Sequence, residues 1–202
     1  MDVKVISATQ WPAFVCSTAA GICYGKDNAS RKRLRTCFNA DHLSVFEHAS
    51  ATFSVEGISR ACMAQLTRHR LASFCVESQR YCKYDEAFFA GDWYVIPPQF
   101  FEDHPAEFAE HMERCADAYR GAIMAGVKAE DARYLLPEAT KTNLIVTMNA
   151  RQLFHVADMR MDSAAQWEIR DLARVMLREL KDEGDEWAFT IGLWEDKHAI
   201  VL

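Results

Sequence analysis

The residues best suited to chemistry form one short segment, in which Arg68-His69-Arg70 is separated by seven residues from Ser78. Neighbouring cationic side chains repel one another, so a bound anion such as a phosphate would stabilise them. Ser78 and Arg80 are two positions apart, which in an extended segment places both side chains on one face. A hydroxyl beside a guanidinium forms a good phosphate grip. The segment therefore indicates an anionic ligand.

Further polar side chains occur at helical spacings. Gln65 precedes Arg68 by about one helical turn, and its amide can bind an amide-like edge such as that of uracil. Arg151 and His155 are four apart and share a helix face, so both can contact one ligand. Simpler explanations stay open: an Arg-His-Arg tripeptide is often a solvated basic turn, and His48 or His155 can be a core histidine.

The elements that must position these residues are strands interleaved with long helices. Alternation predicts strands at residues 3–6, 51–55 and 143–148, and an extended segment at 74–81. Helices are predicted at 12–23, after a cap at Asn28 or Ser30, and at 58–69, 108–126, 150–159 and 164–181. Without a regular β-α-β order, this pattern favours an α+β fold with a mixed or antiparallel sheet packed with long helices. No linker is apparent, which predicts a single domain over residues 1–202.

Composition excludes several classes of protein. Half of the 202 residues are hydrophobic, which predicts a real core, and the net charge of −6 argues against an extended nucleic-acid-binding surface. No apolar run approaches the roughly 18 residues that span a bilayer. Seven cysteines without a Cys-x-x-Cys pair predict buried free thiols in a reducing cytoplasm. We expect no metal site, because His104 and His111 beside glutamates are typical of an exposed helix face.

The surrounding sequence resembles the flavin-dependent thymidylate synthases. Their signature is Arg-His-Arg, seven residues, then Ser, and Arg80-Tyr81 follows here as it often does in that family. Residues 46–50 resemble the family's segment upstream of this signature, residues 149–160 its third conserved block and residues 165–170 the start of its last long helix. One departure is Val76, where many members carry Glu or Gln; the adjacent Glu77, or backbone groups, would have to substitute.

This resemblance implies a role for each matching residue. FAD would be bound by Ser50, Arg68, His69, Arg70, Asn149, Arg151 and His155. The substrate dUMP would be bound by Gln65, Arg68, Ser78, Gln79, Arg80, Arg133 and Arg160. Arg160 would also promote ionisation of the uracil ring, which makes it the candidate catalytic residue. Arg133 and Arg160 can alternatively form ordinary surface ion pairs with nearby aspartates.

The implied activity is reductive methylation of dUMP to dTMP. The resemblance implies methylenetetrahydrofolate as carbon donor, reduced FAD as hydride donor, NADPH as its reductant, and a homotetramer with no nucleic-acid or membrane partner. No cysteine lies in the Pro-Cys context of the other thymidylate synthase class, so we expect no thiol nucleophile. Two alternatives stay open. One is an RNA- or nucleotide-binding module that uses residues 31–35 and the Arg-His-Arg segment; the other is a flavin-dependent uracil methylase acting on RNA.

Overall fold

The computed structural model describes residues 1–202, and the chain forms two compact units. The chain passes from one unit to the other four times, within β2, α3, β3 and β4. Unit 1 consists of Met1–Val55, Leu66–Phe74 and Ile145–Leu202, and unit 2 consists of Glu56–Gln65 and Cys75–Leu144. The single-domain expectation stays a prediction.

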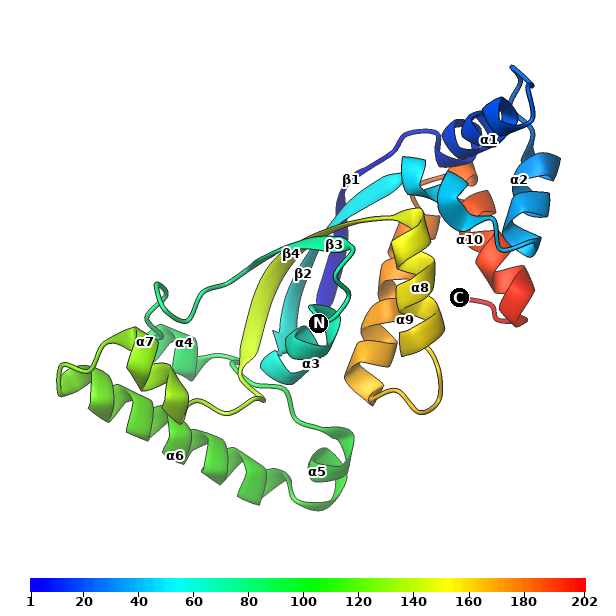
Figure 1. The fold of residues 1–202 in the computed structure, drawn as a ribbon. Coiled ribbons are helices and arrows are strands. Elements are labelled where there is room, and N and C mark those ends of the chain that lie inside the picture. Colours follow the sequence, from blue (N-terminus) through cyan, green and yellow to red (C-terminus); the bar gives the residue numbers. More distant parts are fainter. The chain divides into compact units, whose positions relative to one another are not determined.

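The strands form one four-stranded antiparallel sheet in the order β1-β2-β4-β3, which confirms the predicted α+β class (Figure 1). In β2, Ala51, Phe53 and Val55 are buried, as their alternation predicts. The Thr52 and Thr147 hydroxyls hydrogen-bond across β2 and β4 at 2.9 Å. The strands are β1 (Asp2–Ala8), β2 (Ser50–Ser59), β3 (Ala72–Val76) and β4 (Lys141–Asn149).

Unit 1 packs its helices around an apolar centre. Helix α8 contacts α9 and η1, α9 contacts β1, and α1 packs on α2 and α10. The rings of Phe38, Phe46 and Phe154 meet edge to face, with centroids 5.2–5.5 Å apart. These elements are α1 (Pro12–Cys23), α2 (Arg31–Asn39), η1 (Leu43–His48), α8 (Ala150–Arg160), α9 (Trp167–Lys181) and α10 (Asp185–His198).

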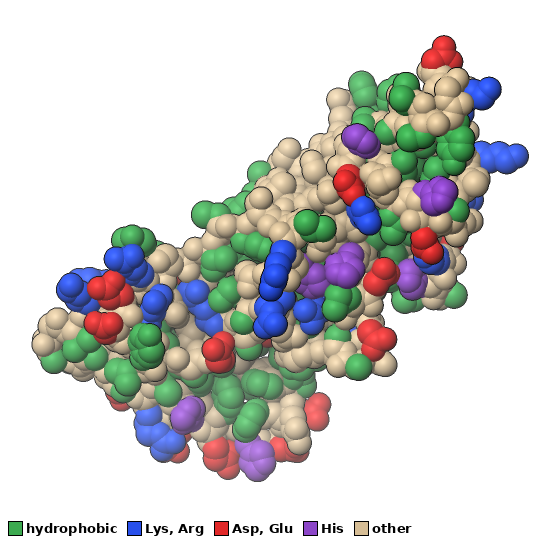
Figure 2. All heavy atoms as spheres, in the orientation of Figure 1, with side chains coloured by type: hydrophobic (Ala, Val, Ile, Leu, Met, Phe, Trp, Pro, Cys, Tyr) green, Lys and Arg blue, Asp and Glu red, His purple; other side chains and the backbone are tan.

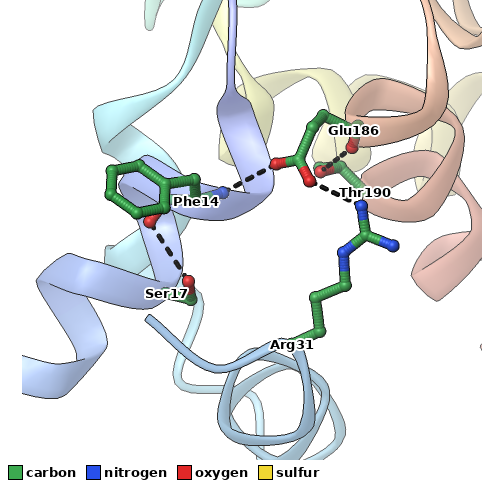
Figure 3. A network of polar contacts seen from close by, with 5 residues as sticks. All are labelled: Phe14, Ser17, Arg31, Glu186 and Thr190. Carbon is green, nitrogen blue, oxygen red and sulfur yellow. Dashed lines mark hydrogen bonds and ion pairs between the residues drawn. The ribbon is translucent and has the colours of Figure 1, made fainter. Parts of the chain in front are cut away.

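Glu186 connects three helices of unit 1 (Figure 3). No side chain caps α1 from its own N-cap residue, but the Glu186 carboxylate on α10 accepts a hydrogen bond from the Phe14 backbone N–H at 2.9 Å. The same carboxylate pairs with Arg31 at the start of α2. Because the first N–H groups of a helix have no partner inside it, Glu186 acts as a cap supplied from a distant helix.

Unit 2 has its own hydrophobic core beneath the long helix α6 (Pro105–Met124). Tyr84, Phe89, Trp93, Met112 and Tyr119 are buried together there. Helix α6 contacts α5, α7 and η2. The remaining elements are α3 (Arg60–Leu66), α4 (Glu86–Ala90), α5 (Pro98–Asp103), α7 (Ala129–Ala132) and η2 (Arg133–Leu135).

Two boundaries near the Arg-His-Arg segment differ from prediction. The helix expected from residue 58 begins at Arg60, because Gly57 adopts a φ of 72° within β2 and the Ser59 hydroxyl caps the helix by accepting from Cys62 N at 3.0 Å. This helix ends at Leu66, before Arg68. The segment expected to be extended over residues 74–81 leaves the strand after Val76.

Some smaller expectations were correct only in part. Of the two candidate caps for α2, Ser30 accepts from Arg33 N, whereas Asn28 binds the Arg33 side chain. Helix α10 was not predicted. None of the helices combines the length and apolar character needed to cross a membrane. All seven cysteines are free, but only three are buried: Cys16, Cys37 and Cys62.

Candidate active site

The predicted site residues fall into two groups, one in each unit. All seven residues predicted to bind FAD lie in unit 1. Five of the residues predicted to bind dUMP lie in unit 2: Gln65, Ser78, Gln79, Arg80 and Arg133. The other two, Arg68 and Arg160, belong to unit 1.

In unit 1, the middle residue of the Arg-His-Arg segment contacts the candidate catalytic arginine. Arg160, at the end of α8, donates from Nε to Nε2 of His69 at 2.9 Å. His69 is buried, and burial, followed by the charges of Arg160 and His155, lowers the pKa of its imidazole to about 4. His69 is therefore neutral at pH 7, with its proton on Nδ1 so that Nε2 can accept. This bond fixes the plane of the Arg160 guanidinium.

The low pKa of His69 predicts an acid-sensitive fold. In the unfolded chain His69 takes up a proton near pH 6.5, whereas in the folded chain it does so only near pH 4. The free energy of unfolding should fall as pH drops through this window, by up to about 3 kcal/mol at about 1.4 kcal/mol per pKa unit. Urea titrations at pH 6.5, 5.5 and 4.5 measure this loss.

The matched variant for this experiment is His69→Gln, whose amide oxygen can still accept from Arg160. Its unfolding free energy should depend less on pH in the same window, because the titrating group is gone. Equal slopes in the two proteins would show that other groups cause the acid sensitivity.

Helix α8 and its N-cap residue present three more of the predicted flavin-binding residues. Asn149 caps the helix, with its side-chain oxygen accepting from Gln152 N at 2.8 Å. Arg151 and His155 are exposed, and Arg151 pairs with Glu47. The His155 ring lies edge to face against His69, with centroids 5.8 Å apart. Figure 2 shows Lys, Arg and His side chains gathered beside α8 on the face drawn.

Several basic residues of unit 1 are available for an anion. Arg68 and Arg70 are exposed, and neither forms an ion pair. A cavity of about 320 Å³ has Arg151 in its wall, with His42 and Ser44 nearby. His48 and His155 are exposed, so the core-histidine explanation is wrong for both. The histidine that is buried is His69.

In unit 2, the nucleotide-binding candidates lie around a turn and not along a strand. Ser78 O accepts from the backbone N–H groups of Tyr81 and Cys82, at 3.2 and 2.8 Å. The expectation that Ser78 and Arg80 share a strand face is therefore wrong, because the chain turns immediately after β3. Their contact is instead local: the Ser78 hydroxyl accepts from Arg80 N at 3.2 Å.

Arg80 and Arg133 both contact Glu130. Arg80 Nε donates to the Glu130 carboxylate at 2.8 Å, and Arg133 Nε donates to the Glu130 backbone oxygen at 3.0 Å. Arg133 forms no ion pair with an aspartate, so the alternative of an ordinary surface ion pair is not found for this residue. Arg80 and Arg133 are both held by Glu130, a neighbour of their own unit.

A cavity of about 440 Å³ opens in unit 2. Its wall includes Gln79 and Arg133, two of the predicted nucleotide-binding residues, but not Gln65, Ser78 or Arg80. Arg60 also lines it and was missed in the sequence. The available signal was that Arg60 is the one charged residue of α3.

Glu77, which follows Val76 at the end of β3, forms hydrogen bonds to the neighbouring strand β4. Its carboxylate accepts from Asn143 Nδ2 at 2.9 Å, and its backbone N–H donates to Asn143 O at 2.9 Å. Asn143 Oδ1 in turn accepts from Gly57 N at 3.0 Å. Glu77 thus anchors the end of β3.

Comparisons with known proteins agree on one family. The model of the family described as thymidylate synthase complementing protein matches residues 4–183. A flavin-dependent thymidylate synthase of Geobacter sulfurreducens is 43% identical, covering 90% of this chain and 82% of the relative. One from Haloarcula marismortui is 36% identical, covering 90% and 91%. The crystal structure of thymidylate synthase X from Helicobacter pylori with FAD and dUMP has a TM-score of 0.78 and 26% identity, covering 97% of this chain and 98% of that one.

Proposed function

Since this chain belongs to the flavin-dependent thymidylate synthases, which are methyltransferases, we propose that its own residues bind FAD in unit 1 and dUMP chiefly in unit 2. The observation that carries this proposal is the pairing of Arg160 with a buried, neutral His69. It joins the signature segment to the third conserved block within one unit.

The donors of unit 1 suit an anionic dinucleotide. Arg68 and Arg70 offer exposed guanidinium groups, which match phosphate oxygens in geometry and charge. Arg151 and His155 lie four apart on α8, so both can contact the same ligand. Ser50 and Asn149 add polar groups at the adjacent ends of β2 and β4. When bound, the flavin supplies the hydride that completes the new methyl group.

The uracil ring must be activated before its C5 can attack a carbon donor. Electron density moves toward C5 as negative charge develops on the N3 and carbonyl edge of the ring. We assign the stabilisation of that charge to Arg160, whose guanidinium is oriented before the ligand binds. A neutral His69 supports this role, because an imidazolium at 2.9 Å would repel Arg160 and could not accept its hydrogen bond.

The nucleotide itself suits the cavity of unit 2. Arg133 can bind the phosphate, while the Gln79 amide can hydrogen-bond the sugar or the base. Ser78, Arg80 and Gln65 lie outside this cavity wall and remain predicted contacts. The volume of about 440 Å³ is in the range of small-molecule sites.

Several further properties follow from the family resemblance. These are methylenetetrahydrofolate as carbon donor, NADPH as reductant, a homotetramer, and a cytoplasmic location. The exposed apolar side chains Trp11, Phe14 and Ile22 at α1 support self-association, because such a group is typical of a protein contact. The free cysteines accord with a reducing compartment.

Anaerobic mixing of the reduced holoenzyme with dUMP and methylenetetrahydrofolate tests the proposal. We expect dTMP in a single turnover, and a flavin absorbance spectrum in the purified protein. A colourless protein whose nucleic-acid affinity falls steeply with salt would instead indicate a binding module. A yellow protein that methylates RNA and leaves free dUMP unchanged would indicate an RNA uracil methylase.

A further inference from the structure

One guanidinium of unit 2 bridges the two ends of the segment that carries Ser78, Gln79 and Arg80. We call residues 77–84 the nucleotide loop. Arg60 Nη2, at the start of α3, donates to the Glu77 backbone oxygen at 2.8 Å and to the Tyr84 hydroxyl at 3.4 Å. The loop therefore begins and ends on the same nitrogen.

Both ends of the nucleotide loop are also fixed from outside it. Glu77 is paired with Asn143 of β4 through backbone and side chain. Tyr84 is 6% exposed and stacks on Phe88, with centroids 3.8 Å apart and planes 5° apart. Its backbone N–H donates to the Tyr119 hydroxyl at 3.3 Å. The residues between these ends, which include the predicted ligand contacts, form local turns, and Arg80 among them also pairs with Glu130.

The Tyr84 hydroxyl connects Arg60 to the cavity wall. Burial raises the pKa of Tyr84, while hydrogen bonds from Arg60 and from the Gln79 side chain act in the opposite direction. The Tyr84 hydroxyl is therefore protonated at neutral pH, and it accepts from Arg60 Nη2 at 3.4 Å. Gln79 and Arg60 line the same cavity as Arg133. The Gln79 side chain thus lies beside a hydroxyl that belongs to the hydrophobic core of unit 2.

Arg60 is a costly residue to place here. Its Nε–H is buried without a hydrogen-bond partner, and an unpaired buried donor destabilises a fold. An apolar residue at this position would avoid that cost. The gain that offsets this cost is the two hydrogen bonds that the Arg60 guanidinium donates to the ends of the nucleotide loop.

We propose that Arg60 and Tyr84 form a clamp that holds the nucleotide loop, and Gln79 within it, in the conformation that binds the nucleotide. They are positioning residues, and this role rests on the proposed dUMP site in unit 2. A preformed loop loses less conformational entropy on binding, so the clamp should act on dUMP affinity and not on the chemical step. FAD binding should be unaffected, because its predicted residues all lie in unit 1.

The test compares Tyr84→Phe and Arg60→Met with Arg114→Met, an exposed arginine of α6 paired only with Glu110. Tyr84→Phe removes one oxygen and keeps the stacked ring. We expect the KM for dUMP to rise about fivefold in Tyr84→Phe and about tenfold or more in Arg60→Met. The kcat at saturating dUMP, the KM for the folate and the flavin content should match those of the wild type. Arg114→Met should match the wild type throughout.

The outcomes separate the clamp from simpler explanations. A purely structural role would lower the melting temperature, kcat and flavin content together, without a selective change in the KM for dUMP. An unchanged KM for dUMP in a folded Tyr84→Phe would overturn the clamp, even if Arg60→Met fails to fold. If the wild type forms no dTMP from dUMP, the proposed function itself is wrong; if the wild type is active and the variants equal it, only the clamp is wrong.

Discussion

Replacing Arg160 with methionine is expected to slow dTMP formation about a hundred- to a thousandfold while the protein keeps its FAD. The loss is that of one fixed donor facing developing negative charge, which has this magnitude in other enzymes. Methionine preserves much of the side-chain volume, so α8 should remain folded. Single-turnover formation of dTMP by the photoreduced enzyme measures the chemical step without a nicotinamide reductant, and the flavin absorbance measures cofactor content.

The matched control is Arg174→Met, a half-exposed arginine on α9 that pairs with Asp171. It should turn over at the wild-type rate. Arg160→Lys should be only partly active, because an ammonium carries the charge but lacks the planar fork that His69 orients. If Arg160→Met forms dTMP at the normal rate, the role assigned to Arg160 is wrong. If the variant protein is purified without FAD, Arg160 acts in cofactor binding or folding and not in activation of the uracil ring.

The second large effect is expected for Arg133, the residue that we propose binds the phosphate of dUMP. Arg133→Met should raise the KM for dUMP about thirty- to a hundredfold, which is the loss of a charge-assisted hydrogen bond of about 2–3 kcal/mol. Arg133 lines the cavity, and its side chain is already oriented by the Glu130 backbone oxygen. Steady-state rates over a range of dUMP concentrations separate KM from kcat.

Salt distinguishes this effect from a general loss of packing. In the wild type, the KM for dUMP should rise with ionic strength, and in Arg133→Met this dependence should be weaker because one cation is missing. The deoxynucleoside without its phosphate should bind wild type and variant equally. A KM for dUMP that stays at the wild-type value would place the phosphate elsewhere.

The parts of the fold that periodicity determines were predicted well. In α9, Ile169, Leu172, Met176 and Leu180 are all buried, as the helical stripe indicated. The predicted short strand at residues 51–55 lies in the first half of β2, which continues to Ser59. Helix α10 was missed, although Trp187, Ile191 and Trp194 are buried. Its apolar residues form one block between acidic ends, and the low contrast between its faces hides the helical spacing of these three buried residues.

Local hydrogen bonds account for the errors near the site. Ser59 accepts a bond that starts α3 later than the apolar spacing suggested, and Ser78 accepts two bonds that turn the chain after β3. The Ser59 bond is made by its hydroxyl and the two Ser78 bonds by its backbone carbonyl oxygen, and strand alternation represents neither kind of bond. The boundaries were therefore wrong where a single side chain or carbonyl group competes with the regular pattern.

The candidate site residues came from motif resemblance, but their neighbours did not. His69 and Arg160 are 91 positions apart, and Glu47 and Arg151 are 104 apart. Nothing in a single sequence indicates such pairs, because they depend on how β3, α8 and η1 pack. The state of His69, a buried neutral acceptor, follows only from that packing.

The distant cap of α1 has a consequence for synthesis on the ribosome. Phe14 N–H finds its partner in Glu186, 172 residues later, and the Trp187 indole donates to Thr9 O across 178 residues. The N-terminal segment of unit 1 therefore lacks these two hydrogen bonds until almost the whole chain has emerged from the ribosome. Unit 2 draws all its residues from positions 56–144 and can condense earlier. We expect nascent chains that stop before α10 to depend on chaperones, since their first helices expose surface that only the last one covers.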